Sequence, residues 1–168
     1  MADTVKCFAT YGTLRFDDDS NSTWNESFIK DSLPGQYAIV RGYKMYHKRI
    51  PTENWPYAVQ TNHPDDYIVV TLIRFPDHLF DAKLVEADGI EKYDPEQPEN
   101  SWYQRTIVKA YVFPEDTTEV DIEKIPAHAP TVDAIMYYLP SQPKLDDNQQ
   151  LFPVQNGDWM KRDRTFVS

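Results

Sequence analysis

The amino-acid sequence predicts a single α+β domain, in which a mixed β-sheet or barrel is flanked by one or two helices. The length of 168 residues suits one domain with one hydrophobic core. Several segments are rich in β-branched and aromatic residues, and residues 67–75 are the clearest of these predicted strands. Residues 79–91 follow with apolar side chains at a spacing that fits one face of a helix. This order of elements indicates a mixed sheet or barrel.

The remaining elements follow from apolar alternation and from turn residues. The first strand is expected at residues 5–11, which end at Gly12 and lead into a polar loop. A short helix is expected over residues 24–33, because a polar N-cap precedes it and Pro34-Gly35 would stop it. Further strands are predicted at 37–47, 57–60, 103–113 and 132–139. Loops rich in proline or acidic residues are predicted at 49–56, 61–66, 92–102, 114–130 and 140–154.

The charge and the cysteine content exclude several classes of protein. The chain has 17 basic and 27 acidic residues, a net charge of −10, and no stripe of Lys and Arg, so a nucleic acid polymer is not expected as a partner. A small anionic ligand remains compatible, because backbone N–H groups can bind an anion inside an acidic protein. Cys7 is the single cysteine, which excludes an internal disulfide, and it is expected to be buried in a strand.

The sequence shows neither a targeting segment nor a membrane span. Residues 1–6 lack the pattern of a signal peptide, and no stretch approaches the ~20 apolar residues that a span needs. A cytoplasmic protein without a membrane partner is therefore expected. The histidines are scattered without ligand spacing, so neither a metal ion nor another cofactor is expected; they are His47, His63, His78 and His128.

Two features carry candidate chemistry. Gly12 permits backbone conformations that are closed to other residues and lets a ligand approach closely, so that the following N–H groups could converge on a carboxylate. Glu91 lies where the apolar helical face ends, and partial burial there would raise its pKa toward neutrality. Such a carboxyl group can take a proton from an ammonium group and return it to a leaving amine. An ordinary strand-ending turn and a solvated Glu91 beside Lys92 are the plainer interpretations.

Four short motifs follow one another along the chain. They are Tyr11-Gly12-Thr13-Leu14-Arg15, Asp88-Gly89-Ile90-Glu91, Tyr103-Gln104-Arg105 and Asn156-Gly157-Asp158-Trp159. In this order they resemble the γ-glutamylcyclotransferase-like family. The resemblance implies a mixed β-barrel flanked by a few helices, with residues 1–168 forming one such domain. In that family the tyrosine-glycine turn cradles the substrate, and a glutamate ahead of a Tyr-x-Arg strand acts as the acid/base.

Position by position, the resemblance implies that Glu91 is the catalytic acid/base. Arg105 shares the side-chain direction of Tyr103 in a regular strand, so it either orients a substrate carboxylate or pairs with an acidic residue. Asp158 and Trp159 are expected to be structural. The substrate-binding residues that the resemblance implies are Tyr11, Gly12, Thr13, Leu14, Arg15, Tyr103 and Arg105.

The implied reaction cyclises a γ-glutamyl amine or peptide to 5-oxoproline and releases the amine, without a metal or cofactor. Two other interpretations remain open, since a fold does not fix a function. The pocket could bind or cleave another small anionic ligand, such as a nucleotide signal. Alternatively, the acidic and aromatic surface could engage a protein partner without catalysis. The segment 92–102 joins Glu91 to Tyr103, so it is expected to cap the pocket and to alter which substrate fits.

Overall fold

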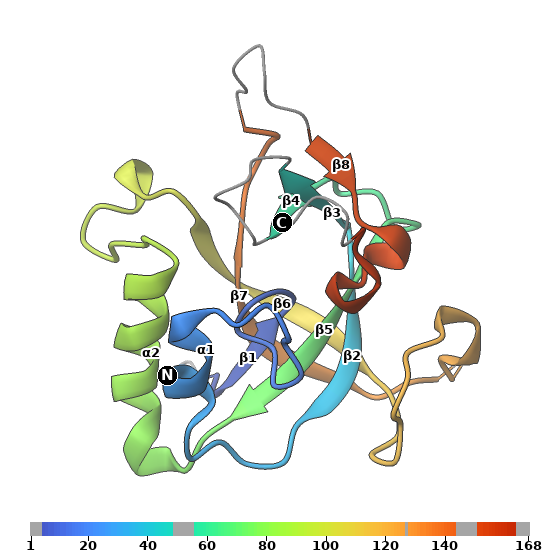
Figure 1. Ribbon diagram of the computed structural model, residues 1–168, viewed down its shortest axis with the longest axis horizontal. Helices are drawn as coiled ribbons and strands as arrows, with labels where there is room; N and C mark the ends of the chain where they lie inside the picture. Colours follow the sequence, from blue (N-terminus) through green and yellow to red (C-terminus); the bar gives the residue numbers. More distant parts are fainter. Residues whose placement is uncertain (1–4, 49–55, 127, 144–150, 164–168) are drawn as a thin grey trace.

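The computed structural model of the chain describes residues 5–48, 56–126, 128–143 and 151–163, and these form a closed β-barrel, a small second sheet and two α-helices (Figure 1). The strand order is β1-β5-β2-β6-β7 in the barrel and β4-β3-β8 in the second sheet. The elements are β1 (Cys7–Thr10), α1 (Thr23–Ile29), β2 (Gln36–Arg41), β3 (Tyr43–Lys48), β4 (Pro56–Gln60), β5 (Tyr67–Arg74), α2 (Asp77–Ile90), β6 (Gln104–Val112), β7 (Thr131–Tyr138) and β8 (Leu151–Pro153). The predicted α+β fold with a mixed β-barrel is confirmed.

Strand β1 closes the barrel. It runs antiparallel to β5, where Thr10 lies opposite Thr71, and parallel to β7, where Phe8 lies opposite Ile135. The inner residues of β5 are all buried, which explains why the sequence of this strand is rich in β-branched and apolar residues. Because β1 is hydrogen-bonded to a strand on each side, the position where the chain leaves the barrel after Thr10 is held in place.

The two α-helices lie side by side along one side of the barrel (Figure 1). An aromatic cluster joins them to it, since the ring centroid of Phe8 in β1 lies 5.4 Å from that of Phe28 in α1 and 5.4 Å from that of Phe80 in α2. Each buried phenyl ring contributes about 1.5–3 kcal/mol to stability, so this cluster fixes both helices. Neither of these described helices is both long and apolar enough to cross a membrane.

One predicted strand is two strands. Residues 37–47 were predicted as a single strand, but they form β2 and β3, which belong to different sheets. The chain turns at Gly42, whose φ of +88° lies in the left-handed region that favours glycine. The apolar alternation continues across this turn, so the pattern alone predicts one strand where the backbone makes two.

Other boundaries differ by smaller amounts. The first helix ends at Ile29 instead of residue 33, because Lys30 is extended and Asp31 has a φ of +64°. Strand β8 lies within the predicted loop at 140–154 and pairs with β3. The loop at 114–130 is partly packed, since Val120 is buried against the barrel. Five predicted strands match observed strands to within two residues at each end; they are 5–11, 57–60, 67–75, 103–113 and 132–139. Parts of two predicted loops, 49–55 and 144–150, lie outside the described residues.

Candidate active site

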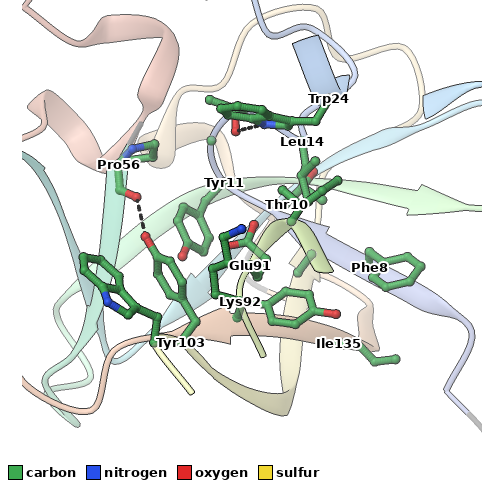
Figure 2. A pocket seen from close by; sticks show the side chains of 16 residues that line it. Phe8, Thr10, Tyr11, Leu14, Trp24, Pro56, Glu91, Lys92, Tyr103 and Ile135 are labelled. Atoms are coloured by element: carbon green, nitrogen blue, oxygen red, sulfur yellow. Dashed lines mark hydrogen bonds between the residues drawn. The ribbon is translucent and has the colours of Figure 1, made fainter. Parts of the chain in front are cut away.

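A cavity of about 640 Å³ lies where the ends of β1 and α2 meet the start of β6 (Figure 2). This volume suits a small organic molecule. Gly12 and Glu91, which are far apart in the sequence, line this same cavity. Its walls are formed by Phe8, Ala9, Thr10, Tyr11, Gly12, Thr13, Leu14, Trp24, Pro56, Ile90, Glu91, Lys92, Trp102, Tyr103, Ile135 and Tyr137.

Residues 11–14, which we call the Gly12 turn, are held in place by helix α1. The Arg15 N–H donates to the Gly12 carbonyl at 3.0 Å and closes a tight turn. The Trp24 Nε1–H donates to the Thr13 hydroxyl at 2.8 Å, and the Asn25 amide donates to the Thr13 carbonyl at 2.8 Å. Within the described residues, the N–H groups of Gly12, Thr13 and Leu14 donate to no acceptor. The turn therefore keeps three backbone donors for a ligand.

Gly12 is needed because another chain segment passes close to it. A Cβ atom at this position would lie 2.5 Å from Pro56 Cγ and 2.6 Å from Pro56 Cδ. Its backbone does not have a positive φ, so the expectation that Gly12 supplies a conformation closed to other residues was wrong. The backbone carbonyl of Pro56 also accepts a hydrogen bond from the Tyr103 hydroxyl at 3.2 Å. Gly12 thus allows two walls of the cavity to meet.

Replacing Gly12 with alanine is expected to destabilise the protein by roughly 1–3 kcal/mol, because the new methyl group must push Pro56 aside. Urea unfolding measures this difference. Gly89→Ala is the matched control, since a Cβ there meets no atom within 4 Å, and in an exposed helix it should stabilise by roughly 0.5–1 kcal/mol. Equal stability of Gly12→Ala and the wild type would refute the close approach of Pro56.

Glu91 is the C-terminal cap of α2, and its carboxyl group is half-buried in the cavity wall. Burial raises the pKa of Glu91 from its ordinary 4.5 to about 7. No described residue makes a hydrogen bond or an ion pair with this carboxyl group. Near neutral pH it can therefore exist in both protonation states, as an acid/base group requires.

A buried carboxylate ahead of Glu91 fixes the end of α2. Arg105 Nη1 lies 2.8 Å and 2.6 Å from the two carboxylate oxygens of Asp88, and the Tyr137 hydroxyl donates to one of them at 2.5 Å. The guanidinium group of Arg105 also lies 4.7 Å from the ring centroid of Tyr93. These contacts tie the last turn of the helix to β6 and β7, and so they position Glu91.

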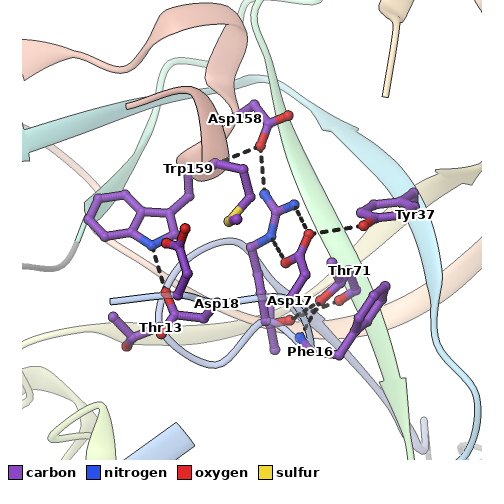
Figure 3. A network of polar contacts seen from close by, with 12 residues as sticks. Thr13, Phe16, Asp17, Asp18, Tyr37, Thr71, Asp158 and Trp159 are labelled. Atoms are coloured by element: carbon purple, nitrogen blue, oxygen red, sulfur yellow. Dashed lines mark hydrogen bonds and ion pairs between the residues drawn. The ribbon is translucent and has the colours of Figure 1, made fainter. Parts of the chain in front are cut away.

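The structure places the two predicted arginines outside the cavity walls. Arg105 pairs with Asp88, which is the second of the two roles left open for it. Arg15 is only 1% exposed, and its guanidinium group donates to Asp17 at 2.8 Å and to Asp158 at 2.8 Å (Figure 3). Both arginines therefore form ion pairs within the protein, and their role in substrate binding stays a prediction.

The C-terminal motif has the structural role that was expected. Asp158 holds Arg15, and Trp159 is fully buried with its Nε1–H donating to Asp18 at 2.9 Å (Figure 3). The Tyr37 hydroxyl completes the network by donating to the Asp17 carboxylate at 2.9 Å. This network fastens the C-terminal segment to the residues that follow the Gly12 turn.

The two predicted tyrosines do line the cavity. Tyr11 is buried, and its pKa is raised mainly by that burial and further by the nearby carboxyl group of Glu91. Tyr103 is 6% exposed and stacks on Tyr57 with ring centroids 6.1 Å apart. With its hydroxyl directed at the Pro56 carbonyl, Tyr103 lies together with Tyr11 on the same side of Glu91 in Figure 2. They form a rigid aromatic wall beside it.

Several cavity residues carried no sequence signal for a site. Trp24, Ile135 and Tyr137 stand in apolar patterns typical of a core, whereas Lys92 and Trp102 stand at the two ends of a predicted loop. Both ends of the 92–102 segment line the cavity, and the capping of the pocket by this segment stays a prediction. The thiol of Cys7 is buried in β1, which raises its pKa to about 11. In the described part of the chain, no three His, Cys, Asp or Glu residues are grouped so that they could hold a metal ion.

Comparison with known proteins identifies the family. No protein of curated function matches the sequence significantly. An uncharacterized protein from Pyrococcus horikoshii aligns with a TM-score of 0.49 and 18% identity over 93% of this chain and 90% of its own. YkqA from Bacillus subtilis has a TM-score of 0.52 and 15% identity, over 93% of this chain and 40% of YkqA. An AIG2-like protein from Mus musculus has a TM-score of 0.52 and 12% identity, over 87% of this chain and 91% of its own.

The two structures with TM-scores of 0.52 share the fold of this chain. The sequence itself matches the family model described as gamma-glutamyl cyclotransferase, AIG2-like, over residues 8–161. This match runs from β1 through the C-terminal Gly-Asp-Trp motif, and it includes every cavity residue. The chain therefore belongs to the γ-glutamyl cyclotransferase, AIG2-like family.

Proposed function

We propose that this protein cyclises γ-glutamyl compounds to 5-oxoproline, with Glu91 as the general acid/base. One observation supports the proposal above all others: a half-buried carboxyl group with a pKa raised to about 7 shares a cavity with a turn that offers three backbone N–H donors. Membership of the γ-glutamyl cyclotransferase, AIG2-like family agrees with this chemistry. The substrate and the catalytic role are our proposals for this chain.

The reaction needs only positioning and proton transfer. Ionised Glu91 takes a proton from the α-ammonium group of the substrate, and the freed amine attacks the γ-carbonyl carbon to close a five-membered ring. After the attack the ring nitrogen still carries two hydrogens. Glu91 gives its first proton to the leaving nitrogen as the γ-amide bond breaks, then takes the second proton from the ring nitrogen and passes it to the released amine, which leaves as an ammonium ion. The products are 5-oxoproline and the free amine, and no water is consumed. Because both reacting groups belong to one molecule, little entropy is lost at this step.

The Gly12 turn is proposed to hold the α-carboxylate of the γ-glutamyl group. Successive backbone N–H donors can bind an anion even in a protein with a net charge of −10. Tyr11, Tyr103 and Ile135 add apolar surface to the cavity wall, which reduces the contact of the bound substrate with water. Exclusion of water strengthens these hydrogen bonds and prevents hydrolysis from competing with cyclisation.

The proposal is tested by incubating the wild-type protein with a panel of γ-glutamyl amines and γ-glutamyl amino acids. We expect 5-oxoproline to form from at least one of them, as measured by mass spectrometry. An N-acetylated form of the same substrate is the matched control, since its α-nitrogen cannot attack. Absence of 5-oxoproline across the panel would refute the proposed function.

The pH dependence of kcat/KM should report the ionisation of Glu91. Only the ionised carboxylate can act as the base, and its pKa is raised to about 7 by burial. We therefore expect kcat/KM to fall about tenfold per pH unit below pH 7 and to level off just above it. Initial rates of 5-oxoproline formation between pH 5 and 8 measure this limb. An inflection near the ordinary glutamate value of 4.5 would contradict the assignment of Glu91.

A further inference from the structure

Lys92 occupies an unusual backbone position next to the proposed catalytic group. Helix α2 ends in a Schellman motif, in which the Lys92 N–H donates to the Gly89 carbonyl at 3.4 Å and the Tyr93 N–H donates to the Asp88 carbonyl at 2.9 Å. This motif places Lys92 at a φ of +56°, where glycine is the favoured residue. A lysine there is strained, and strained residues tend to lie at functional sites.

The side chain of Lys92 borders the cavity at its opening. It is exposed to solvent and yet lines the cavity, and Figure 2 shows it beside Glu91. Trp102 shares this position, since it is 55% exposed and also lines the cavity. The Trp102 N–H donates to the Lys92 carbonyl at 3.2 Å, which fixes the two residues side by side. We call Lys92 and Trp102 the mouth pair.

The charge of the Lys92 ammonium group is uncompensated in the part of the chain that the structure describes. Within the described residues it makes no ion pair, although the chain carries 27 acidic residues. Its carboxylate neighbour Glu91 lies outside ion-pair distance, since no contact within 4.0 Å joins them. An unpaired cation at the mouth of a cavity attracts an anionic group that enters there.

We propose that Lys92 is a specificity-determining residue that favours γ-glutamyl compounds whose leaving amine carries a carboxylate. This inference rests on the proposed function. In the proposed function the α-carboxylate of the γ-glutamyl group binds the Gly12 turn, and the γ-amide bond lies at Glu91. A second carboxylate, on the leaving amine, would then reach the mouth pair. The indole of Trp102 offers an apolar surface for the side chain of that leaving amino acid.

The test uses two substrates that differ by one carboxylate, γ-glutamyl-phenylalanine and γ-glutamyl-phenethylamine. We expect wild-type kcat/KM to favour γ-glutamyl-phenylalanine by about tenfold, as one hydrogen-bonded ion pair of about 1.4 kcal/mol would give. Lys92→Met should reduce this preference to about twofold or less, mainly through the phenylalanine substrate. Lys92→Arg should keep the preference, because it retains the charge. Since exposed charges are screened, the wild-type preference should also shrink in 1 M salt.

Two further variants separate the charge from the backbone. Lys92→Gly removes both the charge and the strained conformation, so it should lose the preference as Lys92→Met does while folding at least as well. Lys109→Met removes an exposed lysine in β6, which does not line the cavity, and should leave the preference intact. Thermal unfolding of each variant confirms that it is folded.

The outcomes distinguish this inference from the proposed function. Turnover of both substrates with no preference in the wild type overturns the role of Lys92 and leaves cyclisation supported. An equal fall for both substrates in Lys92→Met also overturns it, because Lys92 would then act on their common part. Failure of the wild-type protein to turn over either substrate, or any compound in the wider panel, refutes the proposed function and this inference together.

Discussion

Replacing Glu91 with glutamine is expected to lower the rate of 5-oxoproline formation by about 10²–10⁴-fold, which is the usual contribution of a general acid/base group. The amide is nearly isosteric with the carboxyl group, so the cavity keeps its shape and loses only the ability to exchange a proton. Initial rates at pH 7.5, followed by mass spectrometry, measure the effect. Glu99→Gln is the matched control, since Glu99 is exposed in the loop between α2 and β6, and its rate should equal that of the wild type.

The same replacement is expected to stabilise the folded protein above pH 7. Folding raises the pKa of Glu91 from 4.5 to about 7, so the folded state disfavours the ionised form. Below the unfolded pKa the carboxyl group is neutral in both states and contributes no difference. As the pH rises from 4.5 through 7, the unfolded wild type ionises more readily than the folded wild type, so the wild type loses stability and Glu91→Gln does not. Allowing for solvent at the cavity, the gain is about 2–3 kcal/mol at pH 8.

Urea unfolding of the two proteins at pH 5 and pH 8 measures this gap. It should widen as the pH rises and stay constant above pH 8, and Glu99→Gln corrects for the loss of one negative charge. A protein that is both more stable and inactive would show that Glu91 is kept at an energetic cost for function. An equal or lower stability of Glu91→Gln at pH 8 would mean that the carboxylate is well solvated in the folded protein.

Breaking the buried ion pairs of Arg15 is expected to have the largest effect on stability. Arg15→Met removes a guanidinium group that is 1% exposed and leaves the carboxylates of Asp17 and Asp158 without their partner. Removing one partner of a buried pair costs about 3–5 kcal/mol, because an uncompensated charge stays behind. Denaturant unfolding at pH 7.5 measures the loss. The Gly12 turn lies next to Arg15, so turnover should fall as well.

Arg41→Met is the control for Arg15→Met, because Arg41 is exposed at the end of β2 and should change stability by less than about 1 kcal/mol. Similar losses for the two variants would indicate that the network in Figure 3 contributes little. A large loss for Arg15→Met alone would support its structural role. It would also explain why an arginine beside the turn need not bind substrate.

The fold class could be predicted because it depends on local patterns. The β-branched run of β5 and the apolar face of α2 are readable from neighbouring residues. The motifs around Gly12 and Glu91 also lie within a few residues each. The turn at Gly42 was missed because the apolar alternation of β2 continues into β3. The strand pairing and the positive φ at Gly42 show that the chain changes sheets there.

The role of Arg15 could not be predicted because its partner is remote. Asp158 lies 143 positions away, and no local pattern in the sequence joins the two. The strain at Lys92 was hidden for a different reason. A lysine at the end of a helix is favoured by the helix dipole, so its charge suggests an ordinary helix end. The left-handed conformation depends on hydrogen bonds that close only when α2 is folded.

Carbon-13 NMR titration of the Glu91 side-chain carboxyl group tests the central claim most directly. The claim is that Glu91 ionises near neutral pH inside the cavity that it shares with the Gly12 turn. Glu91→Gln assigns the signal, and the titration is repeated with 5-oxoproline in excess. We expect a pKa of about 7 in the free protein and a shift of the signal when the product binds. A carboxyl group that titrates near 4.5 and does not respond to the product would contradict the assignment.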